Sequence, residues 1–310
     1  MITKPTTLIL GAGASAPFGF PTGYELLRRV MEWANINAGC TNPNLFLGFN
    51  RAEIDEFREA LRRSGTTSVD AFLEHRPEFI PIGKEVMSMA LIQCEHEPHL
   101  FKRDGKSWYE YLFNRLNARF EEFDKNQLNI LTFNYDRSLE HFLFTALKHT
   151  SGKSEEECAN KIKSIPIIHL QGDLGALPYT GVVSARPYNS NISLEALNIA
   201  ARRIKIIHEG IEKEPQFAQA QKILSDSDVI CFLGFGYHPL NMERLGFKSH
   251  SMLPEFDITG NIYGSSFGLT HAECNQISDR YRINIGSPQF DCSNLDVLQY
   301  LRETGVLHGN

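Results

Sequence analysis

The chain has 310 residues, of which 42% are hydrophobic and 22% are charged, and its formal net charge is −6 at pH 7. A chain of this length can bury a sizeable core, as one elaborated domain or two small ones, and its negative balance provides no basic field, so we expect no direct binding to nucleic acid. Its six cysteines are scattered without a C-x-x-C pair, which argues against a disulfide framework and against a structural zinc site.

The first apolar segment, TTLILGAGASAPFGFPTG at residues 6–23, could be a targeting leader or a strand that runs into a turn. A secretory leader needs a basic start and a longer apolar stretch than Leu8–Leu10, which Gly11 interrupts. No other window approaches the roughly eighteen uninterrupted apolar residues of a membrane span. We therefore expect a soluble, cytoplasmic chain with its own N-terminus and no membrane association.

Six short apolar runs along the chain are suited to buried parallel strands, and most of them end in Gly, Asn or Asp. They are Thr7–Leu10, Leu128–Thr132, Ile165–Leu170, Val229–Leu233, Ile258–Tyr263 and Tyr281–Ile285. Segments with helical periodicity lie between them. Strands that alternate with helices predict an α/β fold, a doubly wound Rossmann-like parallel sheet covered on both faces.

Two gaps between the predicted strands are longer than a single crossover helix requires. The first, at about 24–124, reads as several helices: Tyr24–Trp33, Arg51–Arg63, Ser68–His75, Ile82–Cys94 and Ser107–Glu122. The second gap, at about 193–224, contains two more predicted helices. Structureless loops of this length are unusual in a compact domain. We therefore predict one domain over residues 1–310, with insertions that form a helical subdomain beside the sheet.

The predicted strand ends carry the residues with the most chemistry, and ligands of open parallel sheets bind at the carboxyl ends of the strands. Gly11 and Gly13 would allow a tight turn and a close approach of backbone N–H groups to a pyrophosphate. The same pair is also compatible with a simple packing turn. Gly19 comes too late for a G-x-G-x-x-G pattern, and no Lys-Ser/Thr follows, which excludes a P-loop.

Polar residues follow the second and third predicted strands. Asn134 could hydrogen-bond a ribose hydroxyl or orient a water, or it could cap the next helix; for Asp136 the cap is the favoured interpretation. His169 lies in an apolar run, where a histidine is more often a core residue than a catalyst. At the mouth of a nucleotide crevice, however, it would be the best candidate for a general base near neutral pH.

A cluster of polar residues, CEHEPH, brings His96 and His99 together with Glu95 and Glu97. Metal sites need ligands that converge on a formed cavity, so we interpret this cluster as the exposed polar end of a helix. We expect no metal site in this chain. Spacing alone singles out no Ser–His–Asp or Cys–His arrangement for nucleophilic catalysis.

Several motifs in order resemble those of the sirtuin family. They are GAGAS at Gly11–Ser15 with GFP at Gly19–Pro21, TFNYD at Thr132–Asp136, and HLQG at His169–Gly172. FLGFGYHPLN at Phe232–Asn241 and IYGSS at Ile262–Ser266 resemble the late motifs that hold the adenosine half of NAD in bacterial sirtuin-like proteins. The resemblance covers the chain from Leu8 to about Ser266.

The resemblance implies that NAD is bound and that the bond between nicotinamide and C1′ of its ribose is cleaved, through a transition state with oxocarbenium character. It implies catalysis by Asn134, which would position water or a ribose hydroxyl, and by His169, which would accept a proton. The implied NAD-binding residues are Gly11, Ala12, Gly13, Ala14, Ser15, Pro21, Thr132, Asp136, Gly234, Phe235, Gly236, Asn241, Gly264 and Ser265.

The chain departs from the family pattern in three places. It lacks the four-cysteine zinc module of deacylating sirtuins, and Thr22-Gly23-Tyr24 follows Pro21 where an acidic residue, Phe and Arg are usual. Gln171 occupies the position of the catalytic His before Gly172, and the only histidine is two residues earlier. Because a strand alternates its faces with period two, we expect His169 and Gln171 on the same side, with His169 as the replacement.

Zinc-free sirtuin-like proteins of bacteria that carry helical insertions look like NAD hydrolases of anti-phage defence. The resemblance therefore implies an NAD⁺ glycohydrolase that depletes NAD. It also implies a homo-oligomer whose sensor is a separate protein, such as a HerA-type hexameric ATPase. Two alternatives stay open: an NAD-dependent protein deacylase, and a non-catalytic sensor that binds NAD or an ADP-ribose-derived signal.

Overall fold

The computed structural model describes residues 1–37, 48–206, 215–247, 258–285 and 295–308. Its centre is one sheet in which all neighbouring strands are parallel, in the order β3-β2-β1-β4-β5-β6. The strands are β1 (Thr6–Leu10), β2 (Leu128–Thr132), β3 (Ile167–His169), β4 (Val229–Leu233), β5 (Asn261–Gly264) and β6 (Asn284–Ile285). This confirms the predicted α/β class with a Rossmann-like parallel sheet.

Three central strands end level with one another. Leu10, the last residue of β1, pairs with Thr132 of β2 on one side and with Leu233 of β4 on the other. The chain moves from β1 to β2 on one side and later returns to place β4 on the opposite side. The crevice between β1 and β4 is therefore the topological switch point, where sheets of this kind bind ligands.

Strand β5 covers Asn261–Gly264 and so begins later than the predicted run Ile258–Tyr263, and two further strands are shorter than the sequence predicts. The predicted run Ile165–Leu170 contains β3 only over Ile167–His169, and Leu170 already belongs to a turn. At the other edge, Tyr281 ends a helix, so β6 keeps only two residues of the predicted run Tyr281–Ile285. Both are edge strands, in which only one neighbour supplies the ladder of hydrogen bonds.

Helices cover both faces of the sheet, as alternation along β1 requires. The side chains of Leu8 and Leu10 pack in one hydrophobic cluster and that of Ile9 in another. The first cluster includes α7 (Trp108–Arg115), α8 (Ser138–Ser151), α9 (Glu155–Ile162) and α14 (Val297–Thr304). The second includes α11 (Pro215–Ser225), α12 (Pro239–Arg244) and the end of α13 (His271–Tyr281).

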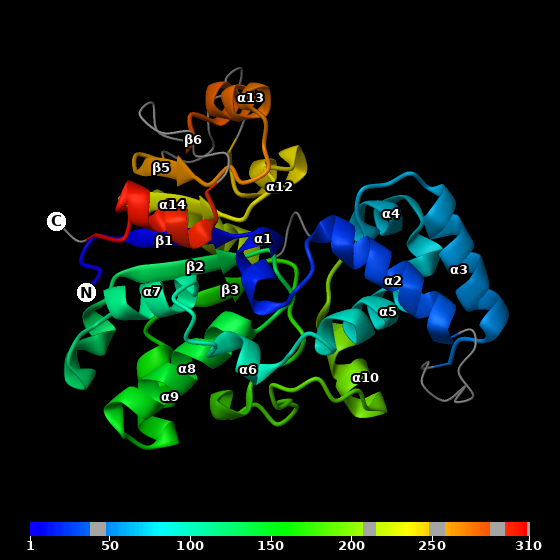
Figure 1. The fold of residues 1–310 in the computed structure, drawn as a ribbon, viewed down its shortest axis with the longest axis horizontal. Coiled ribbons are helices and arrows are strands. Elements are labelled where there is room, and N and C mark those ends of the chain that lie inside the picture. The colour runs from blue at the N-terminus through cyan, green and yellow to red at the C-terminus, as the bar shows by residue number, and fades with distance from the viewer. Residues whose placement is uncertain (38–47, 207–214, 248–257, 286–294, 309–310) are drawn as a thin grey trace.

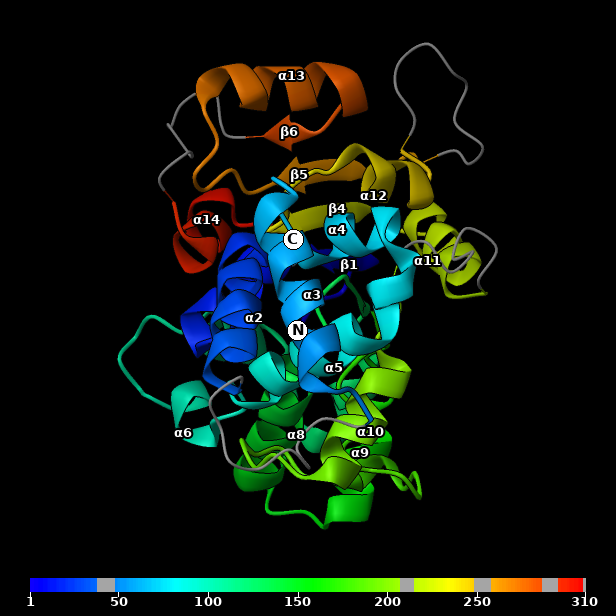
Figure 2. The same cartoon turned by 90° about the vertical axis from the view of Figure 1, so that its right-hand side faces the viewer.

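A group of helices stands beside the sheet, as Figures 1 and 2 show from two sides. We call it the helical group; it consists of α2 (Gly23–Asn37), α3 (Arg51–Arg63), α4 (Val69–His75), α5 (Ile80–Ile92) and α10 (Leu194–Arg203). Its buried side chains, among them Phe57, Phe72 and Leu73, belong to the same hydrophobic cluster as Leu8 of the sheet. The predicted helical subdomain is therefore present and shares the core of the sheet, but α7 of the first predicted insertion and α11 of the second cover the sheet instead.

Local sequence explains where helix α4 begins and how closely it packs. The hydroxyl of Ser68 accepts the N–H of Ala71 at 3.1 Å and caps the helix. Gly83 of α5 lies against Leu73 of α4, and a Cβ added there would come within 2.6 Å of the leucine side chain. The glycine thus lets α4 lie close to α5, and this contact fixes the first turn of α4 and its residue Asp70.

The predicted helix Ser107–Glu122 is interrupted. Helix α7 ends at Arg115, and a 3-10 segment covers Phe120–Lys125. The carboxamide of Asn126 donates to the carbonyl of Leu116 at 3.1 Å and to that of Phe123 at 2.9 Å. It thereby satisfies carbonyl groups that a continuous helix would have paired internally.

Two short helices, α1 (Ala12–Ser15) and α6 (Glu97–Leu100), and 3-10 turns at Ala16–Phe18, Pro77–Phe79 and Pro178–Thr180 complete the fold. In the described ranges, none of the helices has both the length and the apolar character needed to cross a membrane.

Candidate functional site

A cavity of about 200 Å³ opens at the carboxyl ends of β1, β2 and β4. Its wall combines the turns that follow these strands with Gln171 and with side chains of the helical group. The lining residues are Gly11, Ala12, Ser15, Phe20, Pro21, Thr22, Gly23, Leu26, Asp70, Leu91, Phe133, Asn134, Tyr135, Asp136, Gln171, Phe235, Gly236, His238 and Asn241. We call it the inner cavity; it lies at the switch point where α/β folds bind ligands.

A second cavity, of about 520 Å³, adjoins the inner one, and we call it the outer cavity. The two share the lining residues Ala12, Thr22, Gly23, Phe235 and Gly236. The outer cavity extends past Gly13, Gly234 and Ser265 to Phe267, Leu269 and the start of α14. Together the two cavities form an elongated site of the size expected for a nucleotide-sized ligand.

The glycines of the first turn pack backbone against backbone. A Cβ at Gly11 would lie 2.6 Å from the carbonyl oxygen of Gly234, and one at Gly13 would lie 2.9 Å from the Cα of Gly234. The N–H of Gly13 also donates to Gly234 at 2.9 Å. These glycines therefore join the β1 and β4 turns, as the packing-turn interpretation holds. Their contact with a pyrophosphate stays a prediction.

Gly236 differs from these glycines because a Cβ added there would meet nothing within 4 Å, although the residue lines both cavities. We expect Gly236→Val to leave the melting temperature unchanged but to weaken ADP-ribose binding at least about tenfold, since its side chain would occupy the junction of the cavities. Calorimetric titration and thermal unfolding measure the two effects.

Gly234→Ala is the contrasting variant. The φ of Gly234 is +56° and an added Cβ would lie 2.1 Å from the nitrogen of Ala14, so we expect this substitution to destabilise the fold. Unaltered affinity of Gly236→Val would contradict this map of the site.

Asn134 is held in one orientation at the floor of the inner cavity. Its backbone N–H donates to the hydroxyl of Thr132 at 3.0 Å, and its Nδ2 donates to the carbonyl of Gly11 at 2.9 Å and to the hydroxyl of Ser15 at 3.0 Å. A carbonyl can only accept, so the nitrogen must lie on that side. The Oδ1 atom has no partner among the described residues and is free to accept a hydrogen bond from a ligand hydroxyl or a water.

Asp136 helps to hold the side chain of Asn134 in place through Ser15. Its carboxylate accepts the N–H of Ser138 at 3.1 Å, and also the Ser138 hydroxyl, at the start of α8. Burial raises the pKa of Asp136, and hydrogen bonds from Ser138 and Ser15 oppose this effect. Asp136 is not the N-cap expected from sequence: that position belongs to Arg137, and no side chain caps α8, whereas Asp136 lies one residue earlier and accepts the first N–H of the helix. It also fixes Ser15, which accepts a hydrogen bond from Asn134.

His169 does not lie at the inner cavity, contrary to the expectation from sequence. Its Nδ1 contacts the backbone carbonyl of Asn134 at 2.8 Å, and its Nε2 contacts the carboxylate of Glu140. It lines a separate cavity of about 350 Å³, together with Asp173 and Arg203. The expectation assumed that strand alternation continues from His169 to Gln171. Because β3 ends at His169, the chain turns, and Gln171 alone reaches the inner cavity.

His169 instead contributes to stability through its ion pair. Burial by itself lowers the pKa of His169, but the adjacent carboxylate of Glu140 outweighs it and raises the pKa to about 9. A histidine whose pKa is raised in the folded state contributes stability that is complete below the unfolded pKa of about 6.5 and is lost as the pH rises toward 9.

We therefore expect Glu140→Gln to lower the free energy of unfolding by about 2–3 kcal/mol at pH 6. The difference from the wild type should shrink as the pH rises through about 9 and disappear well above it, where His169 is neutral in both proteins. Urea unfolding across this pH range measures it, with the exposed Glu156→Gln as a matched control. A deficit that stays constant with pH would show that His169 is not protonated at neutral pH.

Two side chains of the inner cavity were not identified from sequence. In the sequence, Gln171 stands out only as a departure from a motif, and Asp70 only forms part of a predicted helix. The Oδ1 of Asp70 accepts the hydroxyl of Tyr135 at 2.6 Å, across 65 positions of sequence. Burial raises the pKa of Asp70, and the carboxylate of Glu74 contributes in the same direction. No local pattern marks Asp70, because only the docking of α4 brings it to the sheet.

The structure places most of the other predicted binding residues around the two cavities. Those that line the inner or the outer cavity are Gly11, Ala12, Gly13, Ser15, Pro21, Asn134, Asp136, Gly234, Phe235, Gly236, Asn241 and Ser265. The Oδ1 atom of Asn241 is buried without a partner in the described part of the chain. Ala14, Thr132 and Gly264 line neither cavity. Gly264 leaves room for the hydroxyl of Tyr237, which a Cβ at this position would approach to 2.2 Å.

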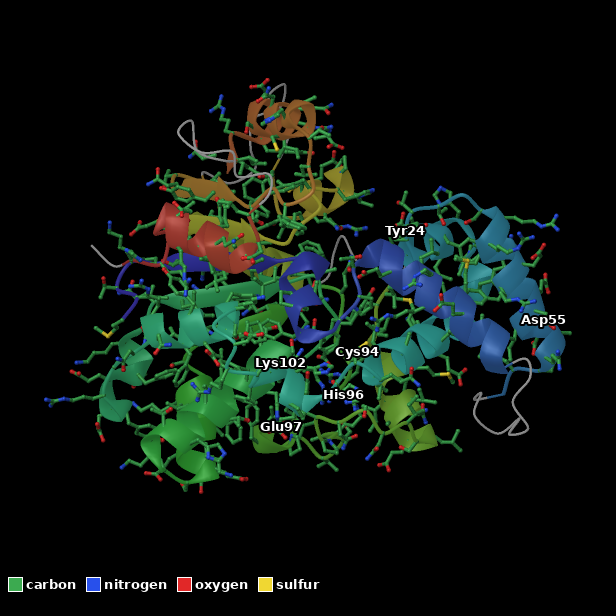
Figure 3. All side chains as sticks on the ribbon, in the orientation of Figure 1. Tyr24, Asp55, Cys94, His96, Glu97 and Lys102 are labelled. Carbon is green, nitrogen blue, oxygen red and sulfur yellow. The ribbon has the colours of Figure 1, made fainter. Side chains whose placement is uncertain are left out.

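The polar cluster around His96 lies apart from both cavities. Figure 3 shows Cys94, His96 and Glu97 near the start of α6. His96 and Glu97 are exposed as expected, but the interpretation of the cluster as an exposed helix end is wrong for Glu95, which is buried. Across the described ranges, no group of His, Cys, Asp and Glu side chains is arranged to hold a metal ion. Within the described residues, Cys94, Cys158, Cys231 and Cys274 form no disulfide, and Cys40 and Cys292 lie outside these residues.

Comparison of the chain with models of known protein families and with curated protein sequences returns no match. The interpretation of the site therefore rests on the motifs and on the geometry described above.

Proposed function

We propose that this chain is an NAD⁺ glycohydrolase, which cleaves the nicotinamide–ribose bond of NAD⁺ to give nicotinamide and ADP-ribose. The observation that carries the proposal is the fixed carboxamide of Asn134, whose two amide hydrogens are donated to Gly11 and Ser15. Its Oδ1 is thereby left as an acceptor inside a cavity at the switch point of the sheet. An acceptor in this position can hold the attacking water or a ribose hydroxyl in the orientation that reaction at C1′ requires.

The shape of the site supports a dinucleotide. The inner cavity is compact and has aromatic and aliphatic walls at Phe20, Leu26 and Phe133, which suits the nicotinamide ribose. The outer cavity is larger and ends at Phe267, whose side chain is 68% exposed. An exposed aromatic ring at the edge of a cavity offers a stacking surface for adenine.

The sirtuin-like motifs support the same proposal, and they extend it to the biological role. On that resemblance we propose that the protein acts in the bacterial cytoplasm, depletes NAD⁺ in anti-phage defence, assembles as a homo-oligomer, and is controlled by a separate sensor such as a HerA-type ATPase.

The decisive experiment incubates purified protein with NAD⁺ in the absence of any acylated peptide and quantifies nicotinamide and ADP-ribose by chromatography. Dilute protein, concentrated protein and protein with a candidate partner are the three conditions, because assembly can order a site and control turnover. Equal amounts of nicotinamide and ADP-ribose would support the hydrolase. A separate reaction contains an acyl-lysine peptide, and release of nicotinamide only in that reaction would identify a deacylase instead.

A second function is favoured by one observation: Gln171, not His169, reaches the inner cavity. A carboxamide cannot accept a proton at neutral pH, so the site can also be interpreted as that of a non-catalytic sensor of NAD or ADP-ribose. Saturable NAD⁺ binding without nicotinamide release in all three conditions would establish the sensor and reject the hydrolase.

A further inference from the structure

Hydrolysis at C1′ releases one proton from the attacking water, and a group in the inner cavity must accept it. Three polar side chains near the reaction centre are unsuited to this. Gln171 is a carboxamide, His169 faces another cavity with its ring nitrogens on Asn134 and Glu140, and Asp136 has its carboxylate committed to Ser138 and Ser15. The remaining carboxylate of the cavity is that of Asp70.

We propose that Asp70, carried into the site by helix α4 of the helical group, is the general base of this site. The inference rests on the proposed function, which it deepens by naming the proton acceptor. Asp70 lines the same cavity as Asn134 and Gln171. One of its oxygens accepts the Tyr135 hydroxyl, and in the described part of the chain no lysine or arginine side chain pairs with it.

The chemical environment of Asp70 suits a base that works near neutral pH. Burial disfavours its charged form and raises its pKa, the carboxylate of Glu74 acts in the same direction, and the Tyr135 hydroxyl opposes both. The other titratable groups that line the cavity are Tyr135, Asp136 and the exposed His238. A carboxylate with a raised pKa is a stronger base than one with an ordinary pKa, and this is the common arrangement for carboxylates that act as bases.

In the proposed step, water replaces nicotinamide at C1′ of the ribose. The oxygen of a water held by Oδ1 of Asn134 forms a bond to C1′, and the bond from C1′ to the ring nitrogen of nicotinamide breaks. The electron pair of that bond goes to the nitrogen, which becomes neutral, and the water proton moves to the carboxylate of Asp70. Solvent then removes the proton, so the products are nicotinamide, ADP-ribose and one proton.

The test compares Asp70→Asn with the wild type and with Glu74→Gln, a matched loss of a carboxylate in the same helix. Asparagine keeps the size of Asp70 and an oxygen that can accept the Tyr135 hydroxyl. We expect Asp70→Asn to lower kcat about 10²–10⁴-fold with little change in KM, and to remove the acidic limb of the pH–rate profile. Glu74→Gln should keep its rate and shift that limb to lower pH, because it removes a neighbouring negative charge.

A binding measurement provides a readout that does not depend on turnover. A non-hydrolysable carbocyclic NAD⁺ analogue has a cationic ring, whereas NADH has a neutral one. In the wild type, affinity for the cationic analogue should rise with pH as Asp70 ionises, while affinity for NADH should not. Asp70→Asn should remove the difference.

The outcomes separate the two proposals. Wild-type turnover together with an unimpaired Asp70→Asn would overturn the assignment of the base and leave the hydrolase intact. Loss of the acidic limb in His238→Gln but not in Asp70→Asn would assign the base to His238 and overturn the proposal in the same way. NAD⁺ bound but not cleaved by the wild type would reject the hydrolase, and with it any base.

Discussion

Asn134→Ala is expected to lower the rate of nicotinamide release about 10²–10³-fold while ADP-ribose binding stays within about threefold of the wild type. The reason is the position of Oδ1, the acceptor of Asn134 that is left without a protein partner at the floor of the inner cavity. In the proposed reaction this atom would contact the attacking water or a ribose hydroxyl, whereas the rest of the nucleotide would lie along the turns that follow β1 and β4. Removal of the carboxamide should therefore affect kcat more than binding.

Asn134→Asp tests the orientation of the carboxamide more sharply. Aspartate has the same size, but it would place an oxygen where Nδ2 now donates to the Gly11 carbonyl at 2.9 Å. Two acceptors at this distance repel, so the side chain must rotate or bind a proton. We expect a loss of rate close to that of Asn134→Ala, together with a partial recovery, relative to the wild type at the same pH, at low pH, where the carboxyl is protonated and can donate.

The exposed Asn160→Ala is the matched control for both variants, because it removes a carboxamide from the surface of α9. Rates come from nicotinamide release at saturating NAD⁺, binding from calorimetric titration with ADP-ribose, and folding from thermal unfolding. Wild-type rates in a well-folded Asn134→Ala would remove the observation on which the proposed function depends.

The sheet and the edge at which the candidate site lies could be predicted because they follow from local patterns. Apolar runs that end in Gly11, Asn134 or Gly234 are short-range signals, and the parallel order of the strands follows from the helices between them. The positions of these three residues at adjacent strand ends are therefore a consequence of the fold class. The glycine contact was less predictable, since the partner of Gly11 is the backbone of Gly234, more than two hundred residues away.

The two residues that distinguish this site could not be assigned from sequence. The position of Gln171 relative to His169 depends on where β3 ends, and a strand that continued through Gln171 would have placed both side chains on the same side. Asp70 reaches the cavity only because Gly83 allows α4 to lie against α5 and because α4 docks beside the sheet. Neither the end of an edge strand nor the docking of a helix is encoded in a local pattern.

Behind the site, one carboxylate holds two arginines in the interior. The Glu95 side chain is fully buried; its oxygens accept Arg137 Nε at 2.9 Å, Arg137 Nη2 at 2.8 Å and Arg186 Nη2 at 2.6 Å. Arg137 also donates to the carbonyls of Gly175 and Ala176 at 2.9 and 3.2 Å. The cluster thus ties the end of α5, the start of α8 and the loop after Gln171 together. Burial lowers the pKa of Arg186, and the Glu95 carboxylate opposes that effect.

We expect Glu95→Gln to lower the free energy of unfolding by about 3–5 kcal/mol, because it leaves two buried guanidinium groups without a counter-charge. The second substitution Arg186→Met should recover part of this loss, since it removes one of the two facing charges and keeps an apolar side chain of similar length. Glu97→Gln, an exposed change two residues away, should cost less than about 0.5 kcal/mol. Urea unfolding measures the stability of all three variants, and the affinity for ADP-ribose provides a second measurement. Because Arg137 follows Asp136 directly, loosening it should also lower the affinity for ADP-ribose, and a stable Glu95→Gln that binds normally would show that the cluster supports neither the fold nor the site.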